Sequence, residues 1–345
     1  MEHQAGTAGE EQRLRRLIAL FLLLCLILSG CAAKPAEVTE RIFAMDTVMD
    51  LTAFGPAAEQ AISAAEAEIY RLEALWSIGF EGSEISRLNR EGSAVVSEET
   101  AALISDALAL YGETGGLFNI AVYPVVDAWG FYSGDHRVPG GEELQALLPL
   151  TDPALVTVRD GTVTLSADGM AIDLGGIAKG YASAAAADAV RKAGASSAIL
   201  SLGGNVYAVG KKPDGTAWKV GVQDPKDTAS LVGILSLEDE AAVTSGAYQR
   251  YFEAGGVRYH HIIDPETGRP SDSGLASVTV VTPDAVRADA YSTALFIMGK
   301  DRALEFWRAG SGFDLVLVEE SGNVTVTEGL RDRFSPYTAF EVAER

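Results

Sequence analysis

The chain has 345 residues, of which 48% are hydrophobic, and a formal net charge of −21. This length allows one large domain or two small ones with a sizeable core. The strong negative charge argues against nucleic acid as a partner and disfavours direct contact with anionic lipid.

The N-terminus has the order of segments found in a secretory signal. Three arginines lie within residues 13–16, an apolar run too short for a comfortable transmembrane helix covers 17–28, and Leu-Ser-Gly-Cys ends at Cys31. This last motif resembles a bacterial lipobox. We predict a signal peptide over residues 1–30, lipidation of Cys31 and a tether over residues 31–40. The folded part is then extracytoplasmic and lipid-anchored to the membrane; an uncleaved N-terminal anchor is the alternative.

The positions of the cysteines limit the thiol chemistry available to the folded part of the chain. The two cysteines are Cys25, inside the signal, and Cys31. The folded part therefore has no disulfide, no thiolate metal site and no cysteine nucleophile.

After the tether, strand and helix patterns alternate without an internal repeat or a strong linker. We therefore predict one domain over residues 41–345. Strands or hairpins are predicted over 41–55, 155–165, 198–209, 218–222, 241–252, 259–270, 276–282, 313–319 and 323–327. Helices are predicted over 59–76, 97–114, 181–193 and 285–298, with a capped short helix or turn over 83–89.

The segment 170–182 is the first candidate site. A short apolar strand is predicted to end at Asp173, followed by a Gly-Gly turn and an Ala-rich helix with Lys179 in its first turn. Free N–H groups at a helix start, a close backbone approach and a lysine together suit a phosphate-bearing ligand. The alternative is a Gly-Gly pair that only turns a strand into a packed helix.

The segment 115–131 mixes glycine, proline and aromatic residues and fits neither a clean helix nor a clean strand. Such a departure from regular patterning favours a binding loop, and a buried aromatic corner is the alternative.

Two further places offer ligand or proton chemistry. Asp289 and Thr293 are four residues apart on a predicted helix, so both oxygens project from one face and suit a hard cation such as Mg²⁺; a solvated helix face is the alternative. His260 and His261 are adjacent on a predicted strand and face opposite ways. One of them, beside Asp264, is either a general base or orienting group, or a structural histidine.

Taken together, eight segments in order resemble the ApbE family of FAD:protein FMN transferases. They are Met-Asp-Thr at 45–47, Ser-Glu-Ile-Ser-Arg-Leu-Asn at 83–89, the aromatic segment 118–131, Ile-Asp-Leu-Gly-Gly-Ile-Ala-Lys-Gly-Tyr-Ala at 172–182, Leu-Gly-Gly-Asn at 202–205, Thr-Ser-Gly at 244–246, 261–270, and Ala-Asp-Ala-Tyr-Ser-Thr-Ala-Leu at 288–295. They span nearly the whole mature chain.

The resemblance implies an α+β fold, a single ApbE-like domain of mixed and antiparallel sheets with flanking helices. It implies Mg²⁺-dependent transfer of FMN from FAD to a Thr or Ser hydroxyl of an acceptor protein, with release of AMP. Rnf-type or sodium-pumping quinone reductase subunits, or exported flavoproteins, are the implied acceptors. An FAD pyrophosphatase giving FMN and AMP, and a non-catalytic FAD-binding lipoprotein, are the alternatives.

The resemblance also implies roles for eleven residues. The implied FAD contacts are Met45, Leu117, Phe118, Asn119, Asp173, Lys179 and Ile262. The implied metal ligands are Asp289, Thr293 and the carbonyl of Gly176, and the implied catalytic residues are His261 and Asp289. Two positions depart from the family pattern: Asn119 stands where an aspartate is usual, and Gly79 stands at a frequent aromatic position, with Phe80 next to it.

Overall fold

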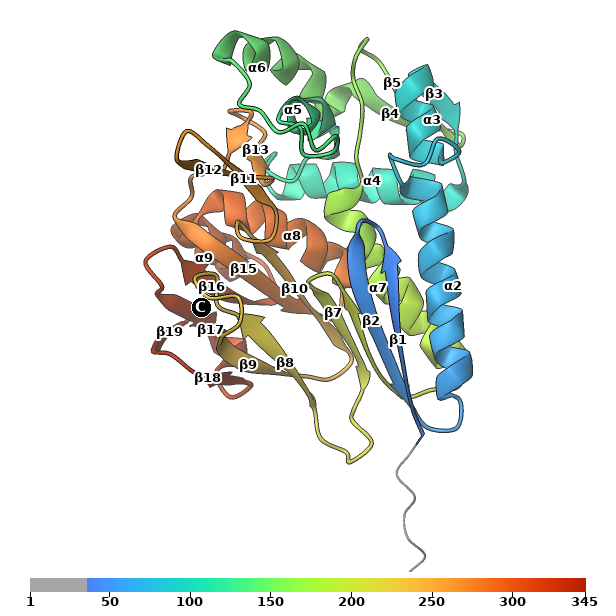
Figure 1. Cartoon of the computed structure of the whole chain (residues 1–345), viewed down its shortest axis with the longest axis vertical. Coiled ribbons are helices and arrows are strands. Elements are labelled where there is room, and N and C mark those ends of the chain that lie inside the picture. Colours follow the sequence, from blue (N-terminus) through green and yellow to red (C-terminus); the bar gives the residue numbers. More distant parts are fainter. Residues whose placement is uncertain (1–35) are drawn as a thin grey trace, which may run out of the picture. The chain divides into compact units, whose positions relative to one another are not determined.

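A sheet of mostly antiparallel strands forms the centre of the structure (Figure 1). The computed structural model describes residues 36–345, and within them this sheet has nine strands in the order β1-β2-β6-β7-β10-β15-β16-β17-β19. All neighbouring strands are antiparallel except β17 and β19. The strands are β1 (Glu37–Ala44), β2 (Thr47–Phe54), β6 (Ser197–Leu202), β7 (Asn205–Gly210), β10 (Glu240–Gly246), β15 (Leu275–Thr282), β16 (Asp314–Glu319), β17 (Val324–Thr327) and β19 (Phe340–Ala343).

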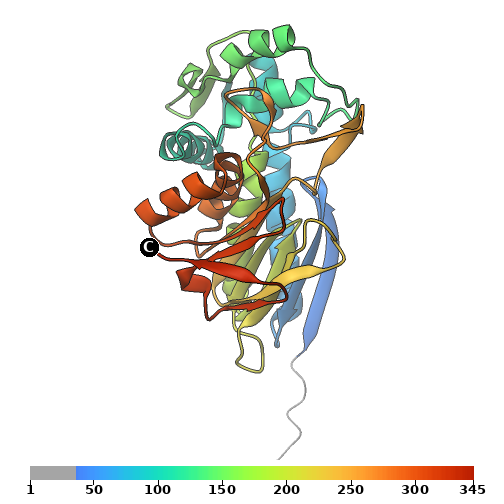
Figure 2. The same cartoon turned by 90° about the vertical axis from the view of Figure 1, so that its left-hand side faces the viewer.

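Three helices cover one face of this sheet, as the side view in Figure 2 shows. They are α2 (Ala58–Trp76), α7 (Gly175–Lys192) and α8 (Ala285–Met298). The apolar spacing that predicted α2 is the stripe that it buries, from Ile62 to Trp76. Full burial of each aliphatic side chain in such a stripe contributes about 1.5–3 kcal/mol. This face and its helices form the main core.

A smaller sheet covers the opposite face. Its strands are β8 (Trp218–Gln223), β9 (Leu231–Leu237) and β18 (Phe334–Pro336). Trp218, Leu235 and Phe334 pack there against Ala208 and Val316 of the central sheet. Side chains alternate across each strand of the central sheet, so these two strand residues face away from the helices.

The remaining elements lie mainly at one end of the central sheet (Figure 1). They are α3 (Glu84–Glu91), β3 (Ser93–Val95), α4 (Glu98–Glu113), η1 (Ile120–Val122), α5 (Tyr123–Ala128), α6 (Gly141–Leu147), η2 (Leu148–Thr151), η3 (Pro153–Leu155), β4 (Val156–Arg159), β5 (Thr162–Leu165), β11 (Tyr251–Ala254), β12 (Val257–His260), β13 (Ile263–Asp264) and β14 (Arg269–Pro270). Near the C-terminus, α9 (Lys300–Ala309) precedes β16 and η4 (Glu328–Leu330) follows β17.

Local signals account for several boundaries. Ser83 caps α3 by accepting a hydrogen bond from the N–H of Ser86 at 2.9 Å. Ser97 caps α4 in the same way, because its hydroxyl accepts a hydrogen bond from the N–H of Thr100. The predicted hairpin between β4 and β5 is confirmed. Asp160 and Gly161 at its turn both have positive φ, which the Asp-Gly pair tolerates.

Two predicted elements were wrong. Residues 198–209 form two antiparallel strands, β6 and β7, because Gly203 and Gly204 adopt φ of 58° and 103° and turn the chain back. Residues 170–173 are not a strand, because the N–H and carbonyl of Ile172 bond the side-chain amide of Asn89 at 2.8 Å each instead of a neighbouring strand. Helix α7 begins at Gly175, six residues before the predicted range 181–193 but close to the start that Lys179 in a first turn implied.

The domain boundary needs one correction. Strand β1 begins at Glu37, inside the predicted tether, because Glu37 pairs with Phe54 of β2. Residues 37–345 form one compact unit, which agrees with a single folded domain. The predicted signal peptide, Cys31 and the start of the tether lie outside the described residues. None of the helices within residues 36–345 combines the length and apolarity needed to cross a bilayer.

Candidate functional site

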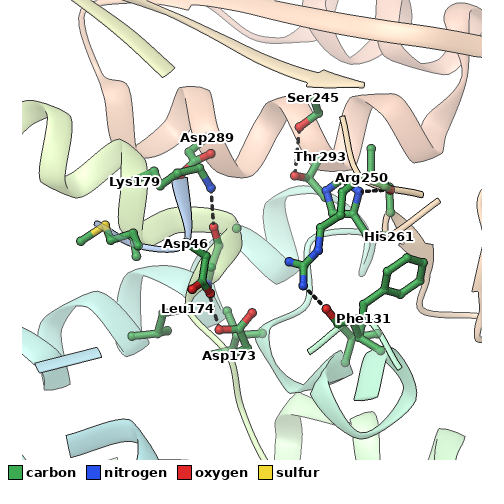
Figure 3. Close-up of a pocket in the computed structure, with 18 of the residues that line it drawn as sticks. Asp46, Phe131, Asp173, Leu174, Lys179, Ser245, Arg250, His261, Asp289 and Thr293 are labelled. Carbon is green, nitrogen blue, oxygen red and sulfur yellow. Dashed lines mark hydrogen bonds between the residues drawn. The ribbon is translucent and has the colours of Figure 1, made fainter. Parts of the chain in front are cut away.

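A cavity of about 390 Å³ lies where the β1–β2 hairpin, the start of α7, the middle of α8 and the segment after β10 converge (Figure 3). All eleven residues to which the sequence assigned a role line this cavity. They are Met45, Leu117, Phe118, Asn119, Asp173, Gly176, Lys179, His261, Ile262, Asp289 and Thr293. Residues separated by up to 248 positions are thus brought together, although their individual roles stay predictions.

The tip of the β1–β2 hairpin is one strained part of the wall. Met45 and Asp46 form a two-residue turn with φ of 49° and 59°, a conformation that normally selects glycine or asparagine. Glu73 of α2 holds the turn by accepting the N–H of Met45 at 2.7 Å. Such strain persists where surrounding structure stabilises it and is frequent at ligand sites.

The start of α7 forms another part of the wall. Gly175 and Gly176 are its first residues rather than a separate turn, and Asp173 accepts the N–H of Gly175 at 3.1 Å. A Cβ at residue 176 would lie 3.1 Å from Phe118, so glycine permits the close approach of that ring. Lys179 follows one turn later and donates to the carbonyl of Gly175 at 3.1 Å. The helix start thus offers N–H groups and a positive charge to the cavity.

Helix α8 places an oxygen cluster beside α7. Asp289 is buried at 4% exposure, and its Oδ2 accepts the N–H of Gly180 at 2.8 Å. In a regular helix the N–H of Gly180 donates to the carbonyl of Gly176. The Asp289 carboxylate therefore competes with that carbonyl for the N–H of Gly180. Thr293 lies one turn further, with its hydroxyl 3.3 Å from that of Ser245.

The oxygen atoms of Asp289, Thr293 and the Gly176 carbonyl are of the kind that binds a hard cation. A carboxylate, a hydroxyl and a backbone carbonyl are all oxygen ligands, the type that Mg²⁺ prefers, with water or substrate phosphate completing the shell. Within residues 36–345, no group of three or more His, Cys, Asp or Glu side chains is arranged to hold a metal ion. A cation at Asp289 would therefore depend on neutral donors and on the ligand.

The two histidines face opposite ways, as their spacing predicted. His260 is buried, with Nε2 at 3.0 Å from the carbonyl oxygen of Ser271. His261 lines the cavity, and its Nδ1 lies 3.1 Å from the carbonyl oxygen of Arg250. A carbonyl only accepts, so Nδ1 bears the proton and Nε2 keeps its lone pair. Burial, with the nearby charges of Arg250 and Lys179, lowers the pKa of His261 below its usual 6.5, so the ring is neutral at pH 7.

The segment 115–131 forms part of the cavity wall and also a buried aromatic corner, the two alternatives that its sequence allowed. Leu117 and Phe118 line the cavity, whereas Trp129 is fully buried and donates to the carbonyl of Gly268 at 2.8 Å. Asn119 also holds the segment in place. Its Oδ1 accepts from Ala121 at 2.8 Å and its Nδ2 donates to Thr151 at 2.9 Å.

Among the polar residues of the cavity wall that sequence reasoning missed, three make contacts that shape the site. Tyr132 donates to Asp173 Oδ2 at 2.7 Å, and burial beside that carboxylate raises the pKa of Tyr132 well above 10. The Arg250 guanidinium lies 5.8 Å from the Tyr132 ring and donates to the carbonyl of Phe131 (Figure 3). Glu73 is the third. Tyr132 directly follows the irregular aromatic segment, and Arg250 lies in a polar-aromatic stretch, which were the available signals.

Phe80 does not replace the aromatic side chain that Gly79 lacks. Its ring is 53% exposed and is absent from the cavity wall, whereas Ile78 lines it.

A sequence model of the ApbE family matches residues 45–317. The chain belongs to the ApbE family. A curated relative, the FAD:protein FMN transferase of Treponema pallidum, is 33% identical over 356 residues, which cover 96% of this chain and 98% of the relative. That of Klebsiella pneumoniae is 34% identical over 274 residues, 78% of this chain and 85% of the relative.

Solved structures of ApbE proteins share the fold. The Thermotoga maritima ApbE protein superposes with a TM-score of 0.81 at 33% identity, covering 86% of this chain and 99% of the other. The flavin transferase ApbE of Vibrio cholerae gives a TM-score of 0.75 at 27% identity, covering 88% and 97%. The predicted family and fold class are therefore confirmed.

Proposed function

We propose that the chain is an FAD:protein FMN transferase that attaches FMN to a Thr or Ser hydroxyl of an acceptor protein and releases AMP. The observation that carries this proposal is the single cavity lined by all eleven expected site residues, in a chain of the ApbE family. Relatives named as FAD:protein FMN transferases, covered over most of their length, support it.

The start of α7 binds the diphosphate of FAD. The N–H group of Gly176 and the ammonium group of Lys179 supply partial and full positive charge on one wall of the cavity. Leu117, Phe118 and Ile262 contribute apolar surface of the cavity for the rings of FAD.

Asp289, Thr293 and the Gly176 carbonyl would hold Mg²⁺. The cation would supply positive charge that neutralises charge developing on the transferred phosphoryl group and on the leaving AMP. Asp289 also fixes the spacing of α7 and α8 through Gly180.

His261 accepts the proton of the acceptor hydroxyl. The hydroxyl oxygen forms a bond to the phosphorus of the FMN half, the diphosphate P–O bond breaks, and AMP leaves with that bridging oxygen. The Arg250 carbonyl orients the imidazole through Nδ1, and the unprotonated Nε2 takes the proton. The lowered pKa of His261 keeps the base form available at neutral pH.

The site works outside the cytoplasm in this proposal. The basic, apolar and Leu-Ser-Gly-Cys segments of residues 13–31 support export and lipid anchoring at Cys31. The acceptor is an exported flavoprotein or a subunit of an Rnf-type or sodium-pumping quinone reductase complex.

Transfer is tested with residues 32–345, FAD, Mg²⁺ and a candidate acceptor domain. Intact-mass spectrometry follows the acceptor and chromatography follows AMP. An FMN-sized mass gain that EDTA abolishes supports the transferase. Release of AMP and free FMN with every acceptor unmodified supports the pyrophosphatase, and unchanged FAD supports a binding protein.

A further inference from the structure

Asn205 is an unusual member of the cavity wall. It is the first residue of β7, directly after the Gly203–Gly204 turn, and is only 2% exposed. Asn205 lines the cavity, and its Nδ2 is fully buried and has no hydrogen-bond partner within residues 36–345. The mechanism described above does not use this residue.

Strand register shows which way the side chain points. Asn205 pairs with Val243 of β10, and residues directly opposite each other project from the same face of a sheet. Ser245 lies two residues beyond Val243 and therefore shares that face. The hydroxyl of Ser245 contacts Ser292 at 2.8 Å and Thr293 at 3.3 Å, both on α8. Asn205 thus faces the helices, on the side of the cavity where the oxygen cluster of α8 lies.

An unpartnered buried amide lowers the stability of the folded chain, since the group loses its bonds to water on folding. Three other side chains within residues 36–345 have a buried atom of this kind: Ser197, Ser277 and Thr325. All three are hydroxyls, and none lines the cavity. Asn205 differs because it belongs to the cavity wall, and a half-turn of its amide exchanges the positions of Oδ1 and Nδ2, so that the NH₂ group can be presented to a ligand.

We infer that Asn205 is a substrate-binding residue whose Nδ2 donates a hydrogen bond to the diphosphate of bound FAD. This inference rests on the proposed function, because it takes FAD as the occupant of the cavity. The location beside the α8 oxygens assigns the contact to the diphosphate rather than to the rings. An amide stabilises phosphate oxygens without adding charge, so it complements Lys179, which lines the same cavity.

The test compares Asn205→Leu and Asn205→Asp with the wild type. Both replacements approximate the shape of asparagine, but leucine removes the polar group and aspartate removes the donor and adds negative charge. Thr325→Val is the matched control, since it removes an unpartnered buried hydroxyl of β17 outside the cavity. Melting temperatures without ligand and the Kd for FAD in EDTA, measured by flavin fluorescence, are the two readouts.

We expect the unliganded Asn205→Leu variant to melt at the wild-type temperature or about 1–3 °C above it. Its Kd for FAD should rise about tenfold, and that of Asn205→Asp should rise further because the carboxylate repels the diphosphate. Thr325→Val should match the Asn205→Leu melting behaviour while it binds FAD as the wild type does.

Three results would overturn the inference. They are an unchanged Kd for FAD in Asn205→Leu, tighter or equal binding in Asn205→Asp than in Asn205→Leu, and a melting temperature of Asn205→Leu that falls by several degrees, which marks a structural role. If the wild type itself bound no FAD, the proposed function would fail first. A wild type that binds FAD and a variant that binds it equally well would refute only the role of Asn205.

Discussion

The backbone N–H of Gly180 on α7 donates a hydrogen bond to Oδ2 of Asp289 on α8 at 2.8 Å. The helices approach this closely because residue 180 has no side chain. A Cβ there would lie 2.2 Å from the carbonyl oxygen of Ala285 and 2.8 Å from Cβ of Asp289. The contact couples the helix start proposed to bind the diphosphate to the carboxylate proposed to bind Mg²⁺.

Gly180→Ala should separate α7 from α8. The added methyl group meets backbone, which has little room to move, so we expect the free energy of unfolding to fall by about 1–3 kcal/mol and Mg²⁺ to be needed at higher concentration. Thermal denaturation and the Mg²⁺ dependence of transfer measure both effects. Gly112→Ala in α4 is the control, because its Cβ would meet no atom within 4 Å. A Gly180→Ala variant as stable as the wild type would contradict the close packing.

Asp289→Asn should abolish most activity while the fold is kept. The amide oxygen of asparagine still accepts the N–H of Gly180, but the negative charge proposed to bind Mg²⁺ is lost. We expect the transfer rate to fall about 100-fold or more at fixed Mg²⁺. The melting temperature of the unliganded protein should change little. Full activity of Asp289→Asn at low Mg²⁺ would remove this residue from the proposed metal site.

His261→Gln should separate proton transfer from FAD binding. Glutamine can still donate to the carbonyl of Arg250 but has no basic nitrogen, so we expect the transfer rate to fall about 100-fold or more with a Kd for FAD close to wild type. Because the pKa of His261 is lowered, the wild-type rate should not fall as pH decreases from 8 to its usual pKa of 6.5. Rapid-mix assays with intact-mass detection measure the rate. A variant that retains the wild-type rate would show that another group takes the proton.

Acid should destabilise the fold through the two adjacent histidines. Burial lowers the pKa of both His260 and His261 below 6.5 in the folded chain. Just below pH 6.5 the unfolded chain therefore binds more protons, so the free energy of unfolding rises with pH there and levels off above it. His260→Gln and His261→Gln should each flatten this rise in a series of melting temperatures. A rise of equal slope in the wild type and both variants would assign the effect to other groups.

Lys179→Met should weaken FAD binding. Methionine keeps much of the apolar side-chain stem but removes the charge that faces the cavity, and we expect the Kd for FAD to rise about 10- to 100-fold. The Kd of the variant should also depend less on salt than that of the wild type. Lys192→Met, in the last turn of the same helix, should bind FAD normally. Equal salt dependence in the two variants would contradict a diphosphate contact at Lys179.

Much of the fold and the site was readable in the sequence, because the signals are local. The apolar spacing of α2, the caps Ser83 and Ser97, and the Asp-Gly turn at 160–161 each act within a few residues. The ordered motifs likewise named eleven residues that share one cavity. The chain can be assigned to the ApbE family from these motifs alone, because the assignment depends on residue identity and order and not on coordinates.

Only the tertiary structure decided which groups come into contact and which buried polar groups lack a hydrogen-bond partner. Ile172 pairs with the amide of Asn89, 83 positions away, so no local pattern could exclude a strand at 170–173. Helix α9, with polar residues on most of its surface, and strand β9 became visible only through packing against distant partners. Tyr132, Arg250 and Glu73 were not predicted as site residues for the same reason, since only contacts between remote segments bring them to the cavity. The missing partner of Asn205 is likewise a property of its whole surroundings, since burial and hydrogen bonding depend on contacts between segments that are remote in sequence.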